Sequence, residues 1–322
     1  MEKNDLYSIA WALLLIFISY PLIIGHDSKH LQLDDPESVR NETLNKSMSS
    51  LTYCEAKWPL FGPRKMKYKP KQTTMVASYP GSGARLSKKF MQAMSGGMVC
   101  SDVRIKKCKD RNSYLTVKTH FPTGNSPVKS FERFASVERS VLLIRNPAKA
   151  IPSWFSFIYE REHHVLGHSV KAPLEEWINF REKNFSTSLE AWIRHAQFWL
   201  EHNRKENTLI VTFEHLVDPQ TGPDELEKFE RFVSQSSGIP LIQEPEDIPC
   251  MWDYVVNSRG GEIQSHRTGG PKLYPYTDEQ IDMIVLELSA IGKNYPEMAN
   301  IMNDYIAEVL ELQATTRSKT LY

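Results

Sequence analysis

The sequence of 322 residues has few cysteines and glycines, 4 and 15, and an ordinary number of prolines, 19. So few cysteines exclude a small protein held together by disulfides, and these numbers of glycines and prolines exclude a collagen-like or low-complexity chain. Hydrophobic residues make up 41% of the chain, which excludes a mostly disordered protein. The length fits one large globular domain or two small ones.

Net charge is also lacking, because 39 Lys and Arg residues balance 39 Asp and Glu residues. This balance hides a segregation along the chain: residues 56–153 contain 20 Lys and Arg but only 4 Asp and Glu. A strongly basic region attracts an anionic ligand, although part of its charge precedes the first predicted strand. We therefore expect an anionic small molecule as ligand and no nucleic-acid partner.

Long uncharged runs are scarce, and the clearest is Leu6–Ile24. As a helix, this run is just long enough to cross a bilayer core of roughly 30 Å. A cleaved signal peptide and an uncleaved anchor both remain open, and the absence of a small-x-small cleavage site favours the anchor. The predicted order is a cytoplasmic tail (1–5), a transmembrane anchor (6–24), a polar lumenal stem (25–71), a globular domain (72–313) and a C-terminal tail (314–322).

Glycosylation sequons and cysteines follow the predicted anchor. The sequons indicate that the body of the chain is lumenal, and they begin at Asn41, Asn45 and Asn184. In that compartment the even number of cysteines predicts two disulfides among Cys54, Cys100, Cys108 and Cys250. Three connectivities remain open; in one, Cys100 and Cys108 close a short loop while Cys54 ties the stem to Cys250.

Short apolar runs alternate with amphipathic segments after residue 72, which is typical of an α/β domain with a parallel sheet. Buried strands are predicted at Thr73–Tyr79, Tyr114–Lys118, Ser140–Ile144 and Thr208–Phe213. Helices are predicted at Ala84–Met94, Pro147–Glu160, Leu189–His202 and Asp224–Ser234. Ligands of such sheets bind at the carboxyl ends of the strands, so we expect the site there.

A glycine-containing turn, Tyr79-Pro-Gly-Ser-Gly-Ala-Arg85, follows the first strand. Glycine lets the backbone approach an anion, and the amides that begin the next helix can cradle a phosphate. The Walker A pattern is absent, because Gly83 is followed by Ala84 and Arg85 instead of Lys and Ser or Thr. The loop is predicted to hold a phosphate but is poorly equipped to split ATP.

Polar residues also follow the next two strands. Lys118 and His120 stand two positions apart, so both can face one cavity, as alternating side chains of a strand do. Arg145 ends the third strand, and Ser153 follows eight residues later in a predicted helix, where its hydroxyl can bind the same anion. Three successive strand ends thus offer a phosphate loop, a Lys/His pair and an Arg/Ser pair.

This combination resembles the sulfotransferase family, which moves a sulfuryl group from 3′-phosphoadenylyl sulfate (PAPS) to a hydroxyl or amine. The resemblance is carried by Tyr79-Pro-Gly-Ser-Gly83, Lys118-Thr-His120 and Arg145 with Ser153, and it covers roughly Thr73 to Tyr305. The motif sequences are similar to those of membrane-anchored members such as the WSC-domain-containing group, although the WSC modules are absent. It implies a three-layer P-loop-like fold, with a parallel sheet between helices.

The resemblance also implies roles for individual residues. His120 is expected to be the general base and Lys118 to stabilise charge on the transferred group. Many family members carry Lys where this chain has Gly81, and we expect Arg85 to supply the missing cation. The cofactor-binding residues implied are Gly81, Ser82, Gly83, Ala84, Arg85, Arg145, Ser153 and Arg267. PAPS is the expected co-substrate, and no metal is expected.

The predicted function is transfer of a sulfuryl group from PAPS to a hydroxyl of a glycoconjugate, by a type II membrane protein of the Golgi. The partner is then a glycan, glycoprotein or glycolipid; terminal sialic acid, other carbohydrate hydroxyls and tyrosine remain open as acceptors, as does the oligomeric state. Two alternatives are an inactive lumenal glycan-binding protein of the same fold and a nucleotide kinase. The kinase would need the Walker lysine, and the inactive protein has no use for Lys118 and His120.

Overall fold

The computed structural model describes residues 69–95, 99–102, 114–123, 137–165, 170–239, 241, 247–257 and 273–320, with side chains up to 315. Several predicted features lie outside these ranges. They are the anchor, most of the stem, Asn41, Asn45, Cys54, Cys108 and Arg267. No described helix is long and apolar enough to cross a membrane.

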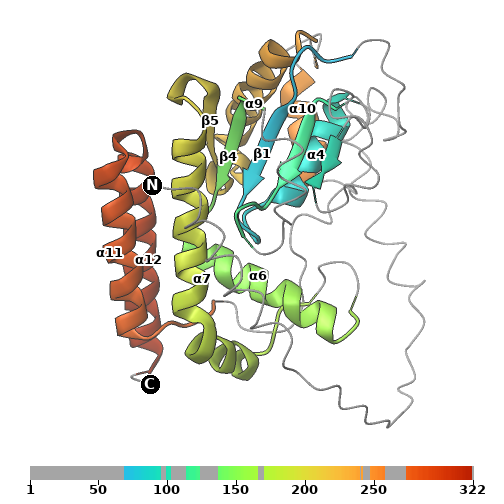
Figure 1. The fold of residues 1–322 in the computed structure, drawn as a ribbon. Helices are drawn as coiled ribbons and strands as arrows, with labels where there is room; N and C mark the ends of the chain where they lie inside the picture. Colours follow the sequence, from blue (N-terminus) through green and yellow to red (C-terminus); the bar gives the residue numbers. More distant parts are fainter. Residues whose placement is uncertain are drawn as a thin grey trace, which may run out of the picture. The chain divides into compact units, whose positions relative to one another are not determined.

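A parallel sheet forms the centre of the described domain, as predicted (Figure 1). Its strand order is β2-β3-β1-β4-β5, and every adjacent pair is parallel. The strands are β1 (Thr74–Ser78), β2 (Val99–Ser101), β3 (Thr116–Thr119), β4 (Ser140–Ile144) and β5 (Thr208–Thr212). The order places β1 at the centre, so the carboxyl ends of β1, β3 and β4 lie beside one another.

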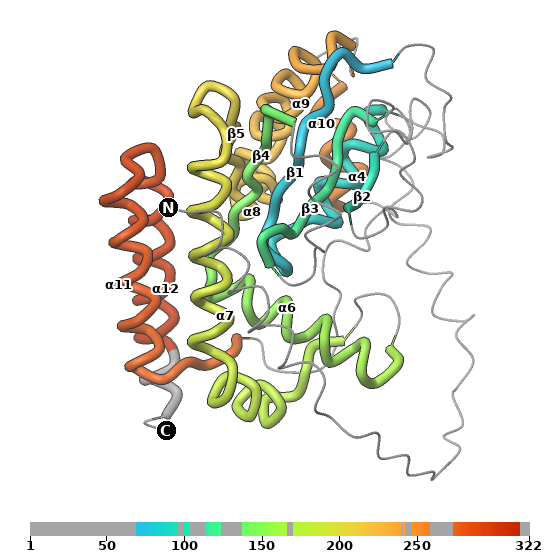
Figure 2. The backbone as a smooth tube through the Cα atoms, viewed as in Figure 1, coloured from blue at the N-terminus to red at the C-terminus, as the bar shows by residue number. Residues whose placement is uncertain are grey.

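Helices cover both faces of this sheet. They are α4 (Ala84–Ser95), α6 (Pro147–Glu162), α7 (Leu174–His202), α8 (Phe213–Val217), α9 (Gly222–Ser237), α10 (Ile248–Val256), α11 (Asp278–Asn294) and α12 (Ala299–Thr320). The short 3₁₀ turns are η4 (Lys205–Asn207) and η6 (Pro296–Met298). Figure 2 shows the hairpin of α11 and α12 beside α7, with α4, α9 and α10 on the other side of the strands.

Alternating side chains of the strands divide the core into two faces. Val76 and Val141 contribute to a cluster with α4, α9 and α10, whereas Met75 and Leu142 contribute to a cluster that includes Trp199 of α7. Both faces are apolar, which explains why the strands read as continuous buried runs in the sequence.

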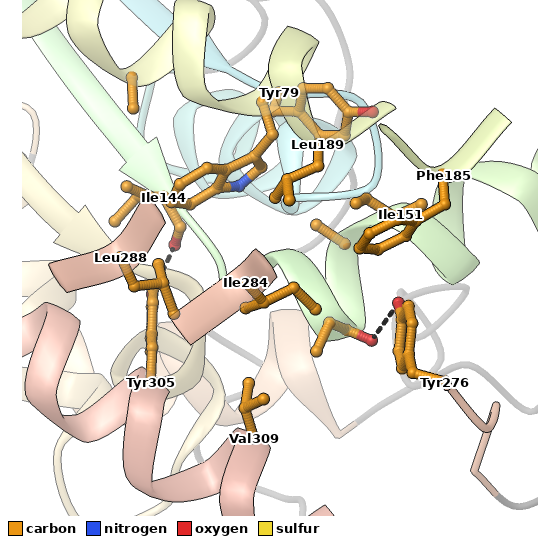
Figure 3. Close-up of a cluster of buried hydrophobic side chains, with 14 of the residues drawn as sticks. Tyr79, Ile144, Ile151, Phe185, Leu189, Tyr276, Ile284, Leu288, Tyr305 and Val309 are labelled. Atoms are coloured by element: carbon orange, nitrogen blue, oxygen red, sulfur yellow. Dashed lines mark hydrogen bonds between the residues drawn. The ribbon is translucent and has the colours of Figure 1, made fainter. Parts of the chain in front are cut away.

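A third cluster joins α6, α7, α11 and α12. Trp177 and Trp192 of α7 are buried within it. Ile284 and Leu288 of α11 belong to the same cluster (Figure 3). A capping box at Thr277 and Gln280 begins α11, because each side chain bonds the backbone N–H of the other residue. α12 continues to Thr320, so the tail predicted at 314–322 begins inside a helix.

Candidate active site

A cavity of about 670 Å³ lies at the predicted edge of the sheet. Eight residues predicted to bind or react line it: Gly81, Gly83, Ala84, Arg85, Lys118, His120, Arg145 and Ser153. The ninth described residue of that set, Ser82, belongs to the loop but is buried. Its hydroxyl has no hydrogen-bond partner among the described residues. Three strand ends that lie far apart in the sequence therefore meet in one cavity.

The loop after β1 depends on two glycines. Gly81 and Gly83 have φ angles of +86° and +93°, a region that favours glycine. A Cβ on Gly81 would lie 2.3 Å from Ala150 O in α6, and one on Gly83 would lie 2.5 Å from the Phe213 ring. The Ser82 amide, expected to help cradle an anion, donates to Tyr79 O at 3.0 Å. The cradle therefore centres on the amides that begin α4.

The end of β3 is held by contacts to its neighbours. The Thr119 hydroxyl donates to Asp102 Oδ2 at 2.5 Å, and the Trp199 indole donates to Phe121 O at 2.7 Å. Thr119 thus faces away from the cavity, while Lys118 and His120, on either side of it, both line the cavity.

His120 is oriented by a bond from its ring to the neighbouring strand. Its Nδ1 lies 2.7 Å from Ser78 O, and because a carbonyl only accepts, Nδ1 carries the hydrogen. Nε2 therefore has the lone pair that a base needs. Burial and, to a smaller extent, the positive charge of Lys118 together lower the pKa of His120 to about 3, against the opposing effect of the bond to Ser78.

Arg145 lies where β4 passes into α6. Its Nη1 donates to Gly81 O at 2.8 Å, and its guanidinium lies 4.2 Å above the centre of the Phe213 ring. Asn146 caps α6 by accepting from the Ala148 amide at 3.0 Å. Arg145 and Ser153 thus line the cavity from either side of the first turns of this helix.

Arg85 lines the cavity from the first turn of α4. Burial lowers the pKa of its guanidinium, and the negative charge of Glu160 opposes this shift. Glu160 is itself buried in α6 and accepts from the Val170 amide at 2.8 Å. Arg85 is therefore close enough to the loop to supply a cation to a ligand in the cavity.

Sequence reasoning missed two parts of the cavity wall. Lys149 stands midway between Arg145 and Ser153, and its spacing of four residues from each could have revealed it. The second part is the wall formed by α12, which consists of Glu308, Val309, Glu311, Leu312 and Thr315. No local sequence motif predicts this wall, because its residues are far in the sequence from the strand ends that form the rest of the cavity.

Three tryptophans differ in their relation to the cavity. Trp154 lines it and stacks on Phe157, with ring centres 5.3 Å apart. Trp177 and Trp252 are instead buried in the core, where both donate their indole N–H to backbone carbonyls.

His195 of α7 is buried, and its Nε2 has no hydrogen-bond partner among the described residues. Its ring meets that of Tyr79 edge to face at 6.4 Å. Burial lowers the pKa of His195 to about 3, and the neighbouring His120 contributes to the same shift.

The described residues contain no group of three or more His, Cys, Asp or Glu side chains that could hold a metal ion. His163 stacks on Tyr159 with ring centres 4.0 Å apart, and His168 lies outside the described residues.

Comparison with protein families gives a match to the central part of the chain. Residues 97–237, somewhat less than half of the chain, match the family model described as the sulfotransferase domain. The match includes Lys118, His120, Arg145 and Ser153, and it excludes the loop at Tyr79–Gly83 and the C-terminal helices. The enzyme class predicted from the sequence, a sulfotransferase, is therefore confirmed.

A similar chain is also found among solved structures. One similar structure is mouse sulfotransferase SULT7A1 complexed with PAP, with 16% identity and a TM-score of 0.47. The match covers 74% of this chain and 89% of the mouse chain. The comparison with curated proteins gave no match.

Proposed function

We propose that this sulfotransferase uses PAPS to sulfate a hydroxyl of a glycoconjugate, with His120 as the general base. The observation that carries the proposal is the meeting of Lys118, His120, Arg145 and Ser153 in one cavity of a sulfotransferase domain. Five Lys or Arg side chains among the described residues line this cavity: Arg85, Lys118, Arg145, Lys149 and Lys171. An anionic donor fits this lining better than a neutral one.

Binding of the donor is assigned to the loop and the first turns of α6. The amides at the start of α4 and the guanidinium of Arg85 would contact the 5′-phosphosulfate. Arg145 and Ser153 would contact the 3′-phosphate, with Lys149 between them as a further cation. Arg267, which lies outside the described residues, is expected to contribute from a later loop.

The proposed chemical step is an in-line displacement at sulfur. The acceptor oxygen forms a bond to sulfur while the bond between sulfur and the 5′-phosphate oxygen of PAPS breaks, which leaves 3′-phosphoadenosine 5′-phosphate (PAP). His120 Nε2 takes the acceptor proton, because Nδ1–H is committed to Ser78 O. Lys118 stabilises the negative charge that develops on the bridging oxygen.

The acceptor is proposed to be a carbohydrate. The stacked pair of Trp154 and Phe157 offers an aromatic surface on the cavity wall, which favours an acceptor with a flat apolar face. Terminal sialic acid, other sugar hydroxyls and tyrosine are to be compared directly in one acceptor panel.

The proposal is tested with the purified domain, radiolabelled PAPS and a panel of glycan and protein acceptors, with ATP in parallel. We expect label transfer from PAPS and none from ATP. His120→Ala should reduce turnover about 10²- to 10⁴-fold while PAP still binds. His163→Ala is the matched control, since this histidine is exposed at the end of α6. Near-normal turnover of His120→Ala would refute the base assignment.

Location in the secretory pathway is part of the proposal. Support comes from the uncharged run at Leu6–Ile24 and from the sequons at Asn41 and Asn45, which lie in the polar stem. Asn184 is exposed but lies inside α7, where its amide donates to Phe180 O, so we expect glycans on the stem in preference to this position. If protease digests the domain in sealed microsomes, the topology is wrong.

The cysteines offer a second test of compartment. Cys100 and Cys250 belong to the described residues, while Cys54 and Cys108 lie outside them. We propose the pairs Cys100–Cys108 and Cys54–Cys250, which non-reducing peptide mapping would identify. Four free thiols in the native protein would contradict both the pairing and the lumenal location.

A further inference from the structure

Arg145 is held in place from several directions. Besides its bond to Gly81 O and its position over Phe213, its own carbonyl accepts the indole N–H of Trp192 at 3.0 Å. Glu214 Oε1 lies 4.0 Å from Arg145 Nε and accepts the Asn146 amide at 3.3 Å. The carboxylate of Glu214 thus contacts both the side chain and the following backbone of this strand end.

Glu214 is in turn fixed by the C-terminal helix. The Tyr305 hydroxyl of α12 donates to Glu214 Oε2 at 2.9 Å, so the two carboxylate oxygens have separate partners. Tyr305 is 3% exposed, and its hydroxyl also lies 3.4 Å from Ile144 O at the end of β4 (Figure 3). Burial and the charge of Glu214 raise the pKa of Tyr305 well above its usual value, so the hydroxyl remains a donor.

α12 makes a second attachment at the start of α6. The Asn146 side-chain amide donates to Tyr305 O at 3.1 Å and to Glu308 Oε2 at 2.8 Å. Glu308 Oε1 also pairs with Lys149 Nζ at 2.9 Å. The residue after Arg145 is therefore bonded directly to α12, which lies outside the segment that matches the sulfotransferase domain.

We propose that Tyr305, acting through Glu214, is a positioning residue that holds Arg145 for the phosphate of the donor. This inference rests on the proposed function of Arg145. It makes α12 a functional part of the donor site, and it assigns Glu214 a role in the orientation of a guanidinium.

Because Glu214 is negatively charged, its removal distinguishes two explanations: positioning of the Arg145 guanidinium and direct electrostatic repulsion of the bound anion. A carboxylate next to an anion site repels the anion, so its removal alone should strengthen binding. A carboxylate that orients the guanidinium should, when removed, weaken binding, because a bidentate contact requires a fixed geometry. Glu214→Gln therefore has opposite expected effects under the two explanations.

The principal experiment compares PAP binding and kinetics in the wild-type domain and in Tyr305→Phe. The substitution keeps the buried ring and removes only the hydroxyl that bonds Glu214. We expect roughly tenfold weaker PAP binding in calorimetry, the loss typical of one hydrogen bond to a charged group. The KM for PAPS should rise by a similar factor while kcat changes little, which general loosening of the fold would not produce.

Tyr295→Phe is the matched control. Tyr295 also donates to a carboxylate, that of Glu201, but at a site that does not line the cavity. We expect this variant to bind PAP as the wild type does. Equal weakening by both tyrosine substitutions would overturn the inference, because it would show a general effect of helix stability.

Glu214→Gln completes the test and serves if Tyr305→Phe folds poorly. Weaker PAP binding by this variant supports positioning, and unchanged or tighter binding overturns it. Failure of the proposed function has a different signature, because the wild-type domain itself would then fail to bind PAP. If the wild type binds PAP and Tyr305→Phe binds it equally well, only the positioning role is refuted.

Discussion

At the scale of single residues, His120 is a buried imidazole that stays neutral over the physiological range. Its usual pKa near 6.5 would leave part of it protonated at mildly acidic pH. Burial, with help from Lys118, lowers the pKa to about 3, so the imidazole stays neutral between pH 5 and 8. A bound anion should raise this pKa again by stabilising the imidazolium.

The pH dependence of the reaction follows from this shift. We expect kcat/KM, which reports the free enzyme, to show no titration near pH 6.5 on the acidic side. The profile of kcat, which reports the complex with the anionic donor, should fall at a higher pH than that of kcat/KM. The check is a pair of pH–rate profiles between pH 5 and 8. A decrease of kcat/KM below the ordinary histidine pKa of about 6.5 would contradict the lowered pKa of the base.

At the scale of elements, the loop after β1 is packed so closely on α6 that one added carbon cannot fit. Gly81→Ala should destabilise the domain by about 1–3 kcal/mol, because it combines a strained φ with a 2.3 Å approach to Ala150 O. PAP binding should weaken as well, since the loop supplies the cradle. Thermal unfolding and calorimetry provide the measurements.

Gly292 provides the matched control for this prediction. It lies inside α11, and a Cβ there would meet its nearest neighbour, Met302 Cβ, at 3.4 Å. Gly292→Ala should leave PAP binding unchanged and stabilise the domain by up to about 1 kcal/mol, because alanine favours the helix. A Gly81→Ala variant as stable as the wild type would show that the loop can move away from α6.

The elements that the sequence predicted correctly share a local signal. Continuous apolar runs such as Ser140–Ile144 indicated the buried strands, and residues directly after them were found in the cavity. By contrast, α7 begins at Leu174, fifteen residues before its predicted start at Leu189, because only tertiary contacts show that Trp177 is buried. Likewise, no local pattern connects Glu308 with Asn146, which lies 162 residues away.

At the scale of the whole molecule, two buried neutral histidines make stability depend on pH. The pKa values of His120 and His195 are lowered to about 3, so the unfolded chain binds protons at these positions well before the folded chain does. As pH falls from about 6.5 towards 3, protonation therefore lowers the free energy of the unfolded state relative to the folded state. The free energy of unfolding declines as a result. Each histidine contributes up to about 1.4 kcal/mol per pH unit.

Denaturant unfolding at pH 7, 6 and 5 tests this expectation. The free energy of unfolding should decrease on acidification, and His195→Asn should reduce the slope because one of the two histidines is gone. His163→Asn, at an exposed position, should leave the slope unchanged. Equal slopes in the wild type and in His195→Asn would contradict a neutral buried His195.

The participation of α12 also has a consequence for biosynthesis. The cavity takes its loop from the start of the described domain and its far wall from Glu308 to Thr315 near the end. The strands, the loop and the Lys118–His120 pair all leave the ribosome before this wall does, so we expect a nascent chain to bind the donor only after the last helix has emerged. We expect a chain that ends after β5 to keep both Lys118 and His120 and still to be inactive.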